Sequence, residues 1–226
     1  MKLSYYGHSC FAVETSGATL LFDPFIRPNS LAASVEVSSI KADYILLSHG
    51  HFDHVADAVE LARLTGATVI SNFEIYTWLG QQGIDKVHPM NHGGSFRFPF
   101  GRVKFVNAIH SSVLPDGTYG GNPGGFVIES GDGSFYYAGD TALTLDMQLI
   151  AEEFDLLFAV LPIGDNFTMG ANDAGRAAKL LNCKNVVGVH YDTFPPIKID
   201  HAEAKATVAK QGAMLHLPAI GQTIDL

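Results

Sequence analysis

The residues best suited to chemistry lie in one short stretch, residues 48–54, which reads Ser-His-Gly-His-Phe-Asp-His. It directly follows the apolar run 44–47, and a short, continuous, β-rich run of this kind predicts a buried strand. The cluster then lies on the loop at the carboxyl end of that strand, where active sites of open α/β sheets are found. Imidazole and carboxylate groups are ligands that Zn²⁺, Mn²⁺, Fe²⁺ or Ni²⁺ accept. The stretch therefore predicts a metal site.

The spacing within this stretch allows one loop to face two metal ions. His49 and His51 are two residues apart, so an extended backbone points both side chains to the same side. Asp53 and His54 turn away from them into the start of the following helix. The competing interpretation, a polar surface loop with chance histidines, is disfavoured because four ligand-type residues fall within six positions.

Three further polar residues each end an apolar, strand-like run: His110, Asp140 and His190. Taken alone, such a residue is more often a cap or a turn residue than a ligand. Strand ends can converge from distant parts of the chain, however, and together with residues 48–54 they predict a complete binuclear site. The predicted ligands are, for the first ion, His49, His51 and His110; for the second ion, Asp53, His54 and His190; and, bridging both ions, Asp140.

Composition limits the classes of protein to which this loop can belong. The chain of 226 residues is 47% hydrophobic and 16% charged, which is enough to bury a large core, and we expect one domain over residues 1–226. The net charge of −9 offers no general attraction to nucleic acid or to an anionic membrane. Two cysteines, Cys10 and Cys183, are too few for a disulfide framework. Without a signal peptide or a run of about 20 apolar residues, the protein is expected to be cytoplasmic and not to contact a membrane.

The apolar periodicity predicts two β-rich openings, each followed by alternating helices and strands. In the first half we expect a hairpin of runs 3–15 and 18–25, a surface loop 27–40 carrying a short helix that could cover the site, and then helix 55–64, strand 68–71, helix 73–82 and strand 85–89. In the second half we expect strands 95–99, 102–109, 125–129 and 134–138, helix 145–153, strand 156–161, helix 173–181, strand 185–189, helix 202–211 and strand 214–217. The repeat of this organisation predicts two sheets packed face to face with helices outside.

The ligand pattern resembles that of the metallo-β-lactamase superfamily: His-x-His-x-Asp-His, then an isolated His, an Asp in Gly-Asp-Thr, and a last His. The resemblance covers nearly the whole chain. It implies an α/β fold, a four-layer αβ/βα sandwich with a binuclear metal centre in the groove between two mixed sheets, and it maps the seven ligands onto the positions above. More narrowly, residues 7–11, 161–164, 167–170 and 190–194 are similar to the uncharacterised metal-dependent hydrolases related to ascorbate 6-phosphate lactonase.

The resemblance also separates branches of the superfamily. Flavodiiron oxidoreductases resemble this pattern but carry Glu in place of the second histidine, so His51 favours hydrolysis over redox chemistry. The chain lacks a long insertion like the RNA-processing module of the larger nuclease branch. We therefore predict a metal-dependent hydrolase. The alternatives are a nuclease acting on RNA or DNA phosphodiesters, and a non-enzymatic metal-binding or redox protein.

The predicted mechanism uses a hydroxide that bridges two divalent ions, Zn²⁺ first and Mn²⁺ or Ni²⁺ as alternatives, because such ions lower the pKa of bound water by many units. The expected catalytic residues are His51, Asp53, which could also accept a proton, and Asp140. Outer groups must hold each imidazole in one tautomer. Ser48, Thr141 and Asp192 are the candidates for this role, although each could equally be a capping or turn residue.

Four residues are predicted to contact substrate: His8, Asn166, Thr168 and Tyr191. His8 interrupts an apolar run, where a polar group needs a partner; it is either a pocket residue or a core histidine. The loop 164–170 follows strand 156–161 and should border the groove, unless it only caps the next helix. The expected substrate is a small polar or phosphorylated molecule with an ester-type bond, a lactone or a phosphodiester. Nucleic acid is a less favoured partner, and a homo-oligomer is the other interaction considered.

Overall fold

The computed structural model describes residues 1–226 and contains two seven-stranded sheets. In spatial order, the first sheet consists of β14 (Thr223–Asp225), β1 (Lys2–Gly7), β2 (Cys10–Thr15), β3 (Ala18–Phe22), β4 (Tyr44–Leu46), β5 (Thr68–Asn72) and β6 (Val87–Met90). The second sheet consists of β13 (Met214–His216), β12 (Asn185–Val189), β11 (Leu156–Pro162), β10 (Gly133–Tyr137), β9 (Gly124–Ser130), β8 (Gly101–Asn107) and β7 (Ser95–Phe98). Both sheets mix parallel and antiparallel pairs.

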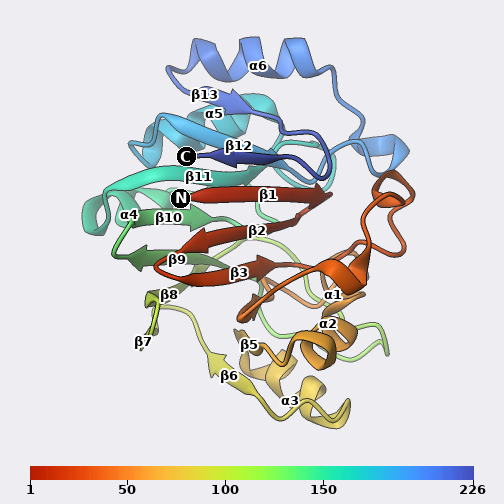
Figure 1. Cartoon of the computed structure of the whole chain (residues 1–226). Coiled ribbons are helices and arrows are strands. Elements are labelled where there is room, and N and C mark those ends of the chain that lie inside the picture. Colours follow the sequence, from red (N-terminus) through yellow and green to blue (C-terminus); the bar gives the residue numbers. More distant parts are fainter.

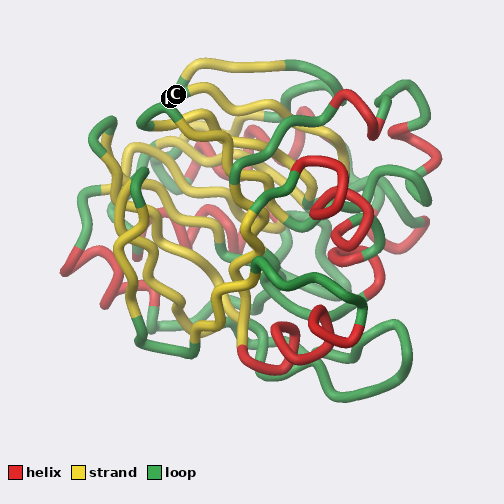
Figure 2. The backbone as a smooth tube through the Cα atoms, turned by 60° about the horizontal axis from the view of Figure 1, so that its bottom comes forward, coloured by secondary structure: helices red, strands yellow, loops and turns green.

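Helices cover the outer faces of both sheets. They are α1 (Phe52–Val55), α2 (Ala58–Thr65), α3 (Phe73–Gln81), α4 (Met147–Glu153), α5 (Ala171–Leu180) and α6 (His201–Lys210), with 3-10 turns η1 (Ser30–Ala32), η2 (Val37–Ser39) and η3 (Pro195–Ile197). Figure 1 shows α6 at one end of the molecule and α2 and α3 at the other, and Figure 2 shows the strands gathered into one body with helical segments around it. The predicted four-layer αβ/βα sandwich is confirmed. None of the helices has the length and apolar character needed to cross a membrane.

The core lies where alternate side chains of the two sheets meet. Phe11 and Phe22 of the first sheet stack with ring centroids 4.6 Å apart. Phe22 also packs edge-on against Phe135 and Tyr137 of the second sheet, at 5.9 and 5.4 Å. All four side chains are fully buried. Because every second residue of a strand points to the same face, this aromatic contact fixes the two sheets face to face.

Parallel pairing determines where the strand ends meet. β3, β4, β5 and β6 run parallel, as do β10, β11 and β12, so within each set the carboxyl ends lie along one edge. In Figure 1, β3 points toward the side of the molecule that carries α1. The segments that follow β4, β10 and β12 carry six of the predicted ligands, and the seventh, His110, follows β8, which runs in the same direction as β10 because both pair antiparallel with β9. Packing the two sheets together brings these edges side by side.

The prediction of a single strand over residues 3–15 is wrong. These residues form two strands, β1 and β2, which pair antiparallel with Gly7 opposite Cys10. The chain reverses because Gly7 and His8 take positive φ, +104° and +54°, a conformation that the strand pattern does not reveal. His8 therefore lies on a tight turn and not inside a strand. The hairpin around Ser16-Gly17 is confirmed.

The predicted helix 55–64 is also divided, into α1 and α2. Asp57 stands at the break, where its carboxylate accepts hydrogen bonds from the backbone N–H groups of Ile26 and Arg27 at 2.6 and 3.0 Å. The hydrogen bonds of Asp57 to this distant segment hold the chain where the backbone hydrogen bonding of a continuous helix is interrupted. The surface loop 27–40 carries short helical turns as predicted, η1 and η2. The strand β14 was not predicted; it pairs with β1 and brings the two termini together, as Figure 1 shows.

Candidate metal centre

The predicted ligands meet at the edge where the two sheets adjoin, in two groups. In the first group, the ligand atoms of His49, His51 and His110 all lie within 4.8 Å of one another. In the second group, those of Asp53, His54, His190 and also His8 lie within 4.8 Å of one another. The strand ends thus bring together residues from both halves of the chain. Asp53, His54 and His190 are the residues predicted to bind the second ion, and His8 is an additional member of this group.

Asp140 stands between the two groups. Its Oδ2 atom lies 3.0 Å from His190 Nε2 and 3.3 Å from His54 Nε2, both in the second group. The same oxygen lies 3.6 Å from His110 Nε2 in the first group. One carboxylate oxygen thus approaches imidazoles of both groups, as the predicted bridging role of Asp140 requires.

The first group consists of neutral imidazoles. Burial lowers the pKa of His49 well below its ordinary value, and it also lowers the pKa values of His51 and His110. The neighbouring His54 lowers the first two further. Neutral imidazole is the form that binds a metal ion, so this group is ready to bind without losing protons.

The second group is dominated by its carboxylates. Burial works against the charge on Asp140, but His190 and His54 hold its pKa well below the usual range. In return, Asp140 raises the pKa of His190 to about 9 and that of His54 well above its ordinary value, although burial lowers both. Asp53 of the second group and the adjoining Asp140 are therefore ionised and favour positive charge beside them, either protons on His54 and His190 or a divalent ion.

Asp23 is a site residue that the sequence analysis missed. Its buried carboxylate accepts a hydrogen bond from Ser48 N at 2.8 Å, from Tyr137 Oη at 2.6 Å and from His54 Nδ1 at 2.7 Å. The bond to Nδ1 leaves His54 Nε2 facing Asp140, which fixes the tautomer and the ring orientation. One signal could have found it: Asp23 follows the apolar strand β3 directly, as the predicted ligands follow theirs.

The three residues expected to orient the ligands differ in their contacts. Ser48 does contact a ligand, because its Oγ lies 3.0 Å from His49 Nδ1 and also bonds to Asp23. The Thr141 hydroxyl accepts from the backbone N–H of Ile109, next to His110, and so positions the chain rather than the ring. Asp192 bonds to His201 and to the backbone of Ile199, away from the ligands.

The residues present fit a metal centre. Among the ligand atoms, His54 Nε2 and Asp140 Oδ1 are buried and have no hydrogen-bond partner. A buried polar atom left unpaired costs about 1–3 kcal/mol, and coordination to a cation would satisfy it. Imidazole nitrogens with a few carboxylate oxygens suit Zn²⁺ and similar divalent ions. Neither cysteine lies in the cluster; both are buried and free.

The four predicted substrate residues are placed differently. His8 is buried, with Nε2 2.9 Å from Asp53 Oδ2 and Nδ1 2.9 Å from Thr193 Oγ1. Tyr191 is also buried and stacks on Tyr5 with centroids 6.2 Å apart. Asn166 is exposed and Thr168 is half-buried, on the loop 164–170.

The loop 164–170 packs against the metal centre. Met169 N donates to the carbonyl of Thr141, the residue after Asp140, at 3.0 Å. At the other end, a Cβ on Gly164 would meet the carbonyl oxygen of His190 at 2.1 Å, so only glycine permits this approach. The loop is thus tied to the chain beside two predicted ligands. His88 and His92 lie outside both groups; His88 is on β6, and His92 Nε2 bonds to the carbonyl of Pro123.

Comparison with known proteins agrees with the class that this fold and centre define. The family model described as "Beta-lactamase superfamily domain" matches residues 2–190. The chain belongs to this superfamily. It is 57% identical over 205 residues to a metal-dependent hydrolase of Methylacidiphilum infernorum, covering 91% of each chain. It is 52% identical to a metal-dependent hydrolase of Christiangramia forsetii over the whole of both chains.

A solved structure shares the fold closely. It is a metallo hydrolase from the archaeon Ignicoccus hospitalis, which is 38% identical with a TM-score of 0.89, covering 99% of this chain and 97% of the other. An isothiocyanate hydrolase from gut bacteria of Delia radicum, 21% identical with a TM-score of 0.81, shows the same fold. With its relatives and its cluster of metal-ligating residues, this chain is a metal-dependent hydrolase of the metallo-β-lactamase superfamily.

Proposed function

We propose that the protein, acting as one domain over residues 1–226, hydrolyses an ester-type bond with the help of two divalent ions, with Zn²⁺ as the first candidate. The observation that carries this proposal is the approach of Asp140 Oδ2 to imidazoles of both ligand groups, within 3.6 Å in each case. Two ions held there would lower the pKa of a water molecule and polarise a scissile carbonyl or phosphoryl group. The bond would be that of a lactone, another ester or a phosphodiester.

Exposure indicates the side from which substrate arrives. The side chains of Asp53 and His110 are 22% and 15% exposed, whereas those of His54, Asp140 and His190 are at most 3% exposed. His51 is also partly exposed. We therefore infer that substrate approaches along His51, Asp53 and His110. Asp53 is ionised on this side of the site and suited to hold a cation, since His54, His190 and His8 hold its pKa well below the usual range in spite of burial.

The number of bound ions is the first test. We expect two divalent ions per chain at saturation, because the ligands form two groups with one bridging carboxylate. Elemental analysis of protein dialysed against Zn²⁺ or Mn²⁺ measures this number, and a chelator-treated sample is the control. A stoichiometry that never exceeds one ion would contradict the binuclear proposal.

The contacts of His8 favour a role different from the substrate contact expected for it. Both ring nitrogens are engaged, one with Asp53 and one with Thr193, and the side chain has no exposed surface. Its carbonyl also accepts the N–H of His190 at 3.0 Å. We infer that His8 holds Asp53 in place for the second ion.

We expect His8→Ala to weaken metal binding or turnover by about 10–100-fold, the usual effect of losing a group that orients a ligand. Competition with a chromogenic chelator measures the affinity, and steady-state kinetics measure turnover. His8→Gln keeps a donor toward Asp53 and should recover part of the loss. If His8→Ala lowered only thermal stability, His8 would be a core histidine.

A screen of substrates separates the alternatives. Metal-loaded protein should hydrolyse at least one lactone, carboxylic ester, thioester or phosphodiester, and chelation should abolish that activity. Failure with all of them would favour a non-enzymatic metal-binding protein, and redox-active iron in protein purified without added metal would favour an oxidoreductase. The net charge of −9 argues against the nuclease alternative, because nucleic acid binding rests on Lys and Arg contacts with phosphates.

A further inference from the structure

An apolar surface adjoins the metal centre. Phe25, Phe52 and Phe194 form what we call the aromatic wall. The ring centroids of Phe25 and Phe52 are 5.9 Å apart, and those of Phe25 and Phe194 are 6.3 Å apart. Phe25 is buried at the base, Phe194 is half-buried and Phe52 is 55% exposed. The three rings come from two distant parts of the chain, and Phe25 packs between Phe52 and Phe194, which reach the surface.

The aromatic wall lies directly beside the proposed ligands. Phe52 stands in the sequence between His51 and Asp53, two of the partly exposed ligands. Phe25 and Phe194 both pack on the ring of His8, with centroid distances of 5.4 and 5.5 Å. His8 in turn contacts Asp53. A substrate group bonded to the reacting centre would therefore reach these rings.

The segments around the centre carry almost no positive charge. These segments are residues 7–9, 23–30, 48–54, 108–123, 139–146, 163–171 and 190–198. Their only Lys or Arg residues are Arg27 and Lys198. Arg27 is paired with Glu60, its Nε donating at 2.7 Å, and Lys198 lines a separate hollow with Asp200 and Glu203.

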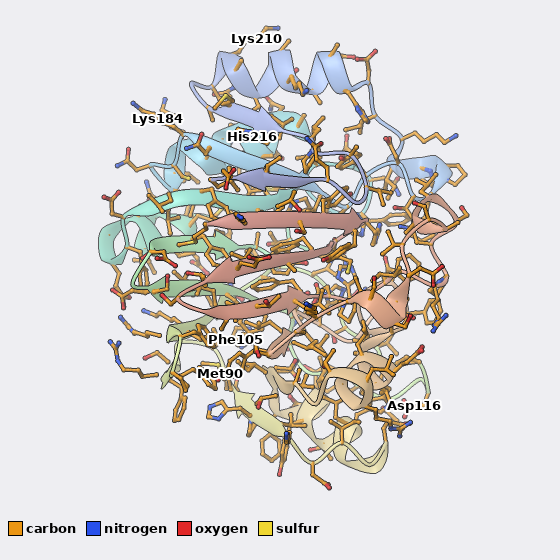
Figure 3. The ribbon with its side chains drawn as sticks, viewed as in Figure 1. Met90, Phe105, Asp116, Lys184, Lys210 and His216 are labelled. Atoms are coloured by element: carbon orange, nitrogen blue, oxygen red, sulfur yellow. The ribbon has the colours of Figure 1, made fainter.

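The other twelve Lys and Arg residues of the chain lie outside these segments. Lys184 and Lys210, for example, appear at the upper left and the top of Figure 3, away from α1, which lies on the right in the same view. A second anionic group on a substrate, such as a carboxylate or a phosphate remote from the scissile bond, would find no lysine or arginine in these segments other than Arg27, which is paired with Glu60, and Lys198, which lines the separate hollow. It would instead meet apolar rings, where an unpaired charge is costly.

We propose that the aromatic wall binds an uncharged, apolar acyl or aryl group next to the scissile bond. This rests on the proposed hydrolase function and narrows its substrate to carboxylic esters, thioesters or lactones with apolar substituents, in place of the phosphorylated molecule expected from the sequence. Burial of the group against the rings removes apolar surface from water and stabilises the complex. Hydrolysis adds one water molecule across the bond: an ester or thioester gives a carboxylic acid and an alcohol or thiol, and a lactone opens to one hydroxy acid.

Two esters of equal chain length test the proposal in the metal-loaded protein. They are p-nitrophenyl hexanoate, whose acyl chain is neutral, and mono-p-nitrophenyl adipate, whose chain ends in a carboxylate. We expect kcat/KM to be at least about tenfold higher for the hexanoate, the scale of discrimination that an apolar pocket provides. Equal values, or a preference for the adipate, would overturn the proposal.

The variant Phe52→Ala connects the preference to the aromatic wall. We expect the ratio of the two kcat/KM values to shrink several-fold, mainly through a higher KM for the hexanoate. Phe96→Ala is the matched control, because Phe96 is a similarly exposed phenylalanine, 47%, on the distant strand β7. It should leave the ratio unchanged. If Phe52→Ala had the same ratio of kcat/KM values as the wild type, the aromatic wall would not be the source of the preference for the hexanoate.

A binding measurement keeps the inference testable if neither ester is hydrolysed, an outcome that would count against the proposed function. Hexanohydroxamic and acetohydroxamic acids share a metal-binding head group and differ only in their apolar tail. Calorimetry with metal-loaded protein should show about tenfold tighter binding of the longer compound, and Phe52→Ala should reduce this difference. Equal affinities would overturn the aromatic wall as an apolar subsite, whatever the result of the ester assay.

Discussion

Asp140→Ala is expected to abolish hydrolysis, lowering kcat/KM by at least about a thousandfold, and to reduce the number of bound ions below two. The reason is position: Asp140 Oδ2 lies within 3.6 Å of imidazole nitrogens in both ligand groups, and no other carboxylate does so. Losing a group that holds charge at the reacting centre removes about 10²–10³ in rate by itself, and loss of an ion adds to this. Kinetics and elemental analysis measure the two effects.

His51→Ala serves as the companion variant. His51 belongs only to the first group, so we expect loss of activity of the same order, with metal binding weakened at one site and retained at the other. Both residues lie on loops at strand ends, and circular dichroism should show a folded protein in each case. Wild-type turnover in either variant would show that the site has been assigned wrongly.

The second large effect concerns stability. Asp23→Ala should lower the free energy of unfolding by about 3–5 kcal/mol, because it leaves buried donors on Ser48, His54 and Tyr137 without their acceptor. For a chain of this size the loss corresponds to a decrease in melting temperature of roughly 10 °C. Thermal and denaturant unfolding of metal-free protein measure it directly.

Two controls separate the contributions of Asp23. Tyr137→Phe removes one donor together with its hydroxyl, so it should cost only about 1 kcal/mol. Asp23→Asn keeps the shape but can accept fewer of the bonds and carries no charge, and it should fall between the other two variants. A loss below 1 kcal/mol for Asp23→Ala would show that the contacts around this carboxylate contribute little to the fold.

The ligand set illustrates why some sites can be predicted from a sequence. Residues 48–54 contain four ligand-type residues directly after an apolar strand, and His110, Asp140 and His190 each end another such run. Side-chain chemistry and the position of strand ends are local properties, so they can be detected one segment at a time. The structure then brings all seven residues to one edge.

The surroundings of the ligands could not be predicted in this way. His8, Asp23 and His190 all take positive φ, 54°, 39° and 56°, although none is glycine. Such conformations are unfavourable in an isolated chain and persist only where tertiary contacts hold them, here the bonds of His8 to Asp53 and His190 and the bond of Asp23 to His54. These unfavourable conformations therefore lie at the candidate site, where apolar periodicity alone predicts strand for His8 and Asp23.

By itself, the sequence determined the class of this protein. The alternation of strands and helices indicated the α/β fold, and the type and spacing of the histidines and aspartates indicated a metal site. Only the tertiary structure decided what those ligands touch. In the folded chain His54 bonds to Asp23 and His8 bonds to Asp53. Phe25 packs against both Phe52 and Phe194, two residues that are 142 positions apart in the sequence. These are contacts between segments far apart in sequence, and they form because the two sheets bury their aromatic faces against each other, which no segment can do alone.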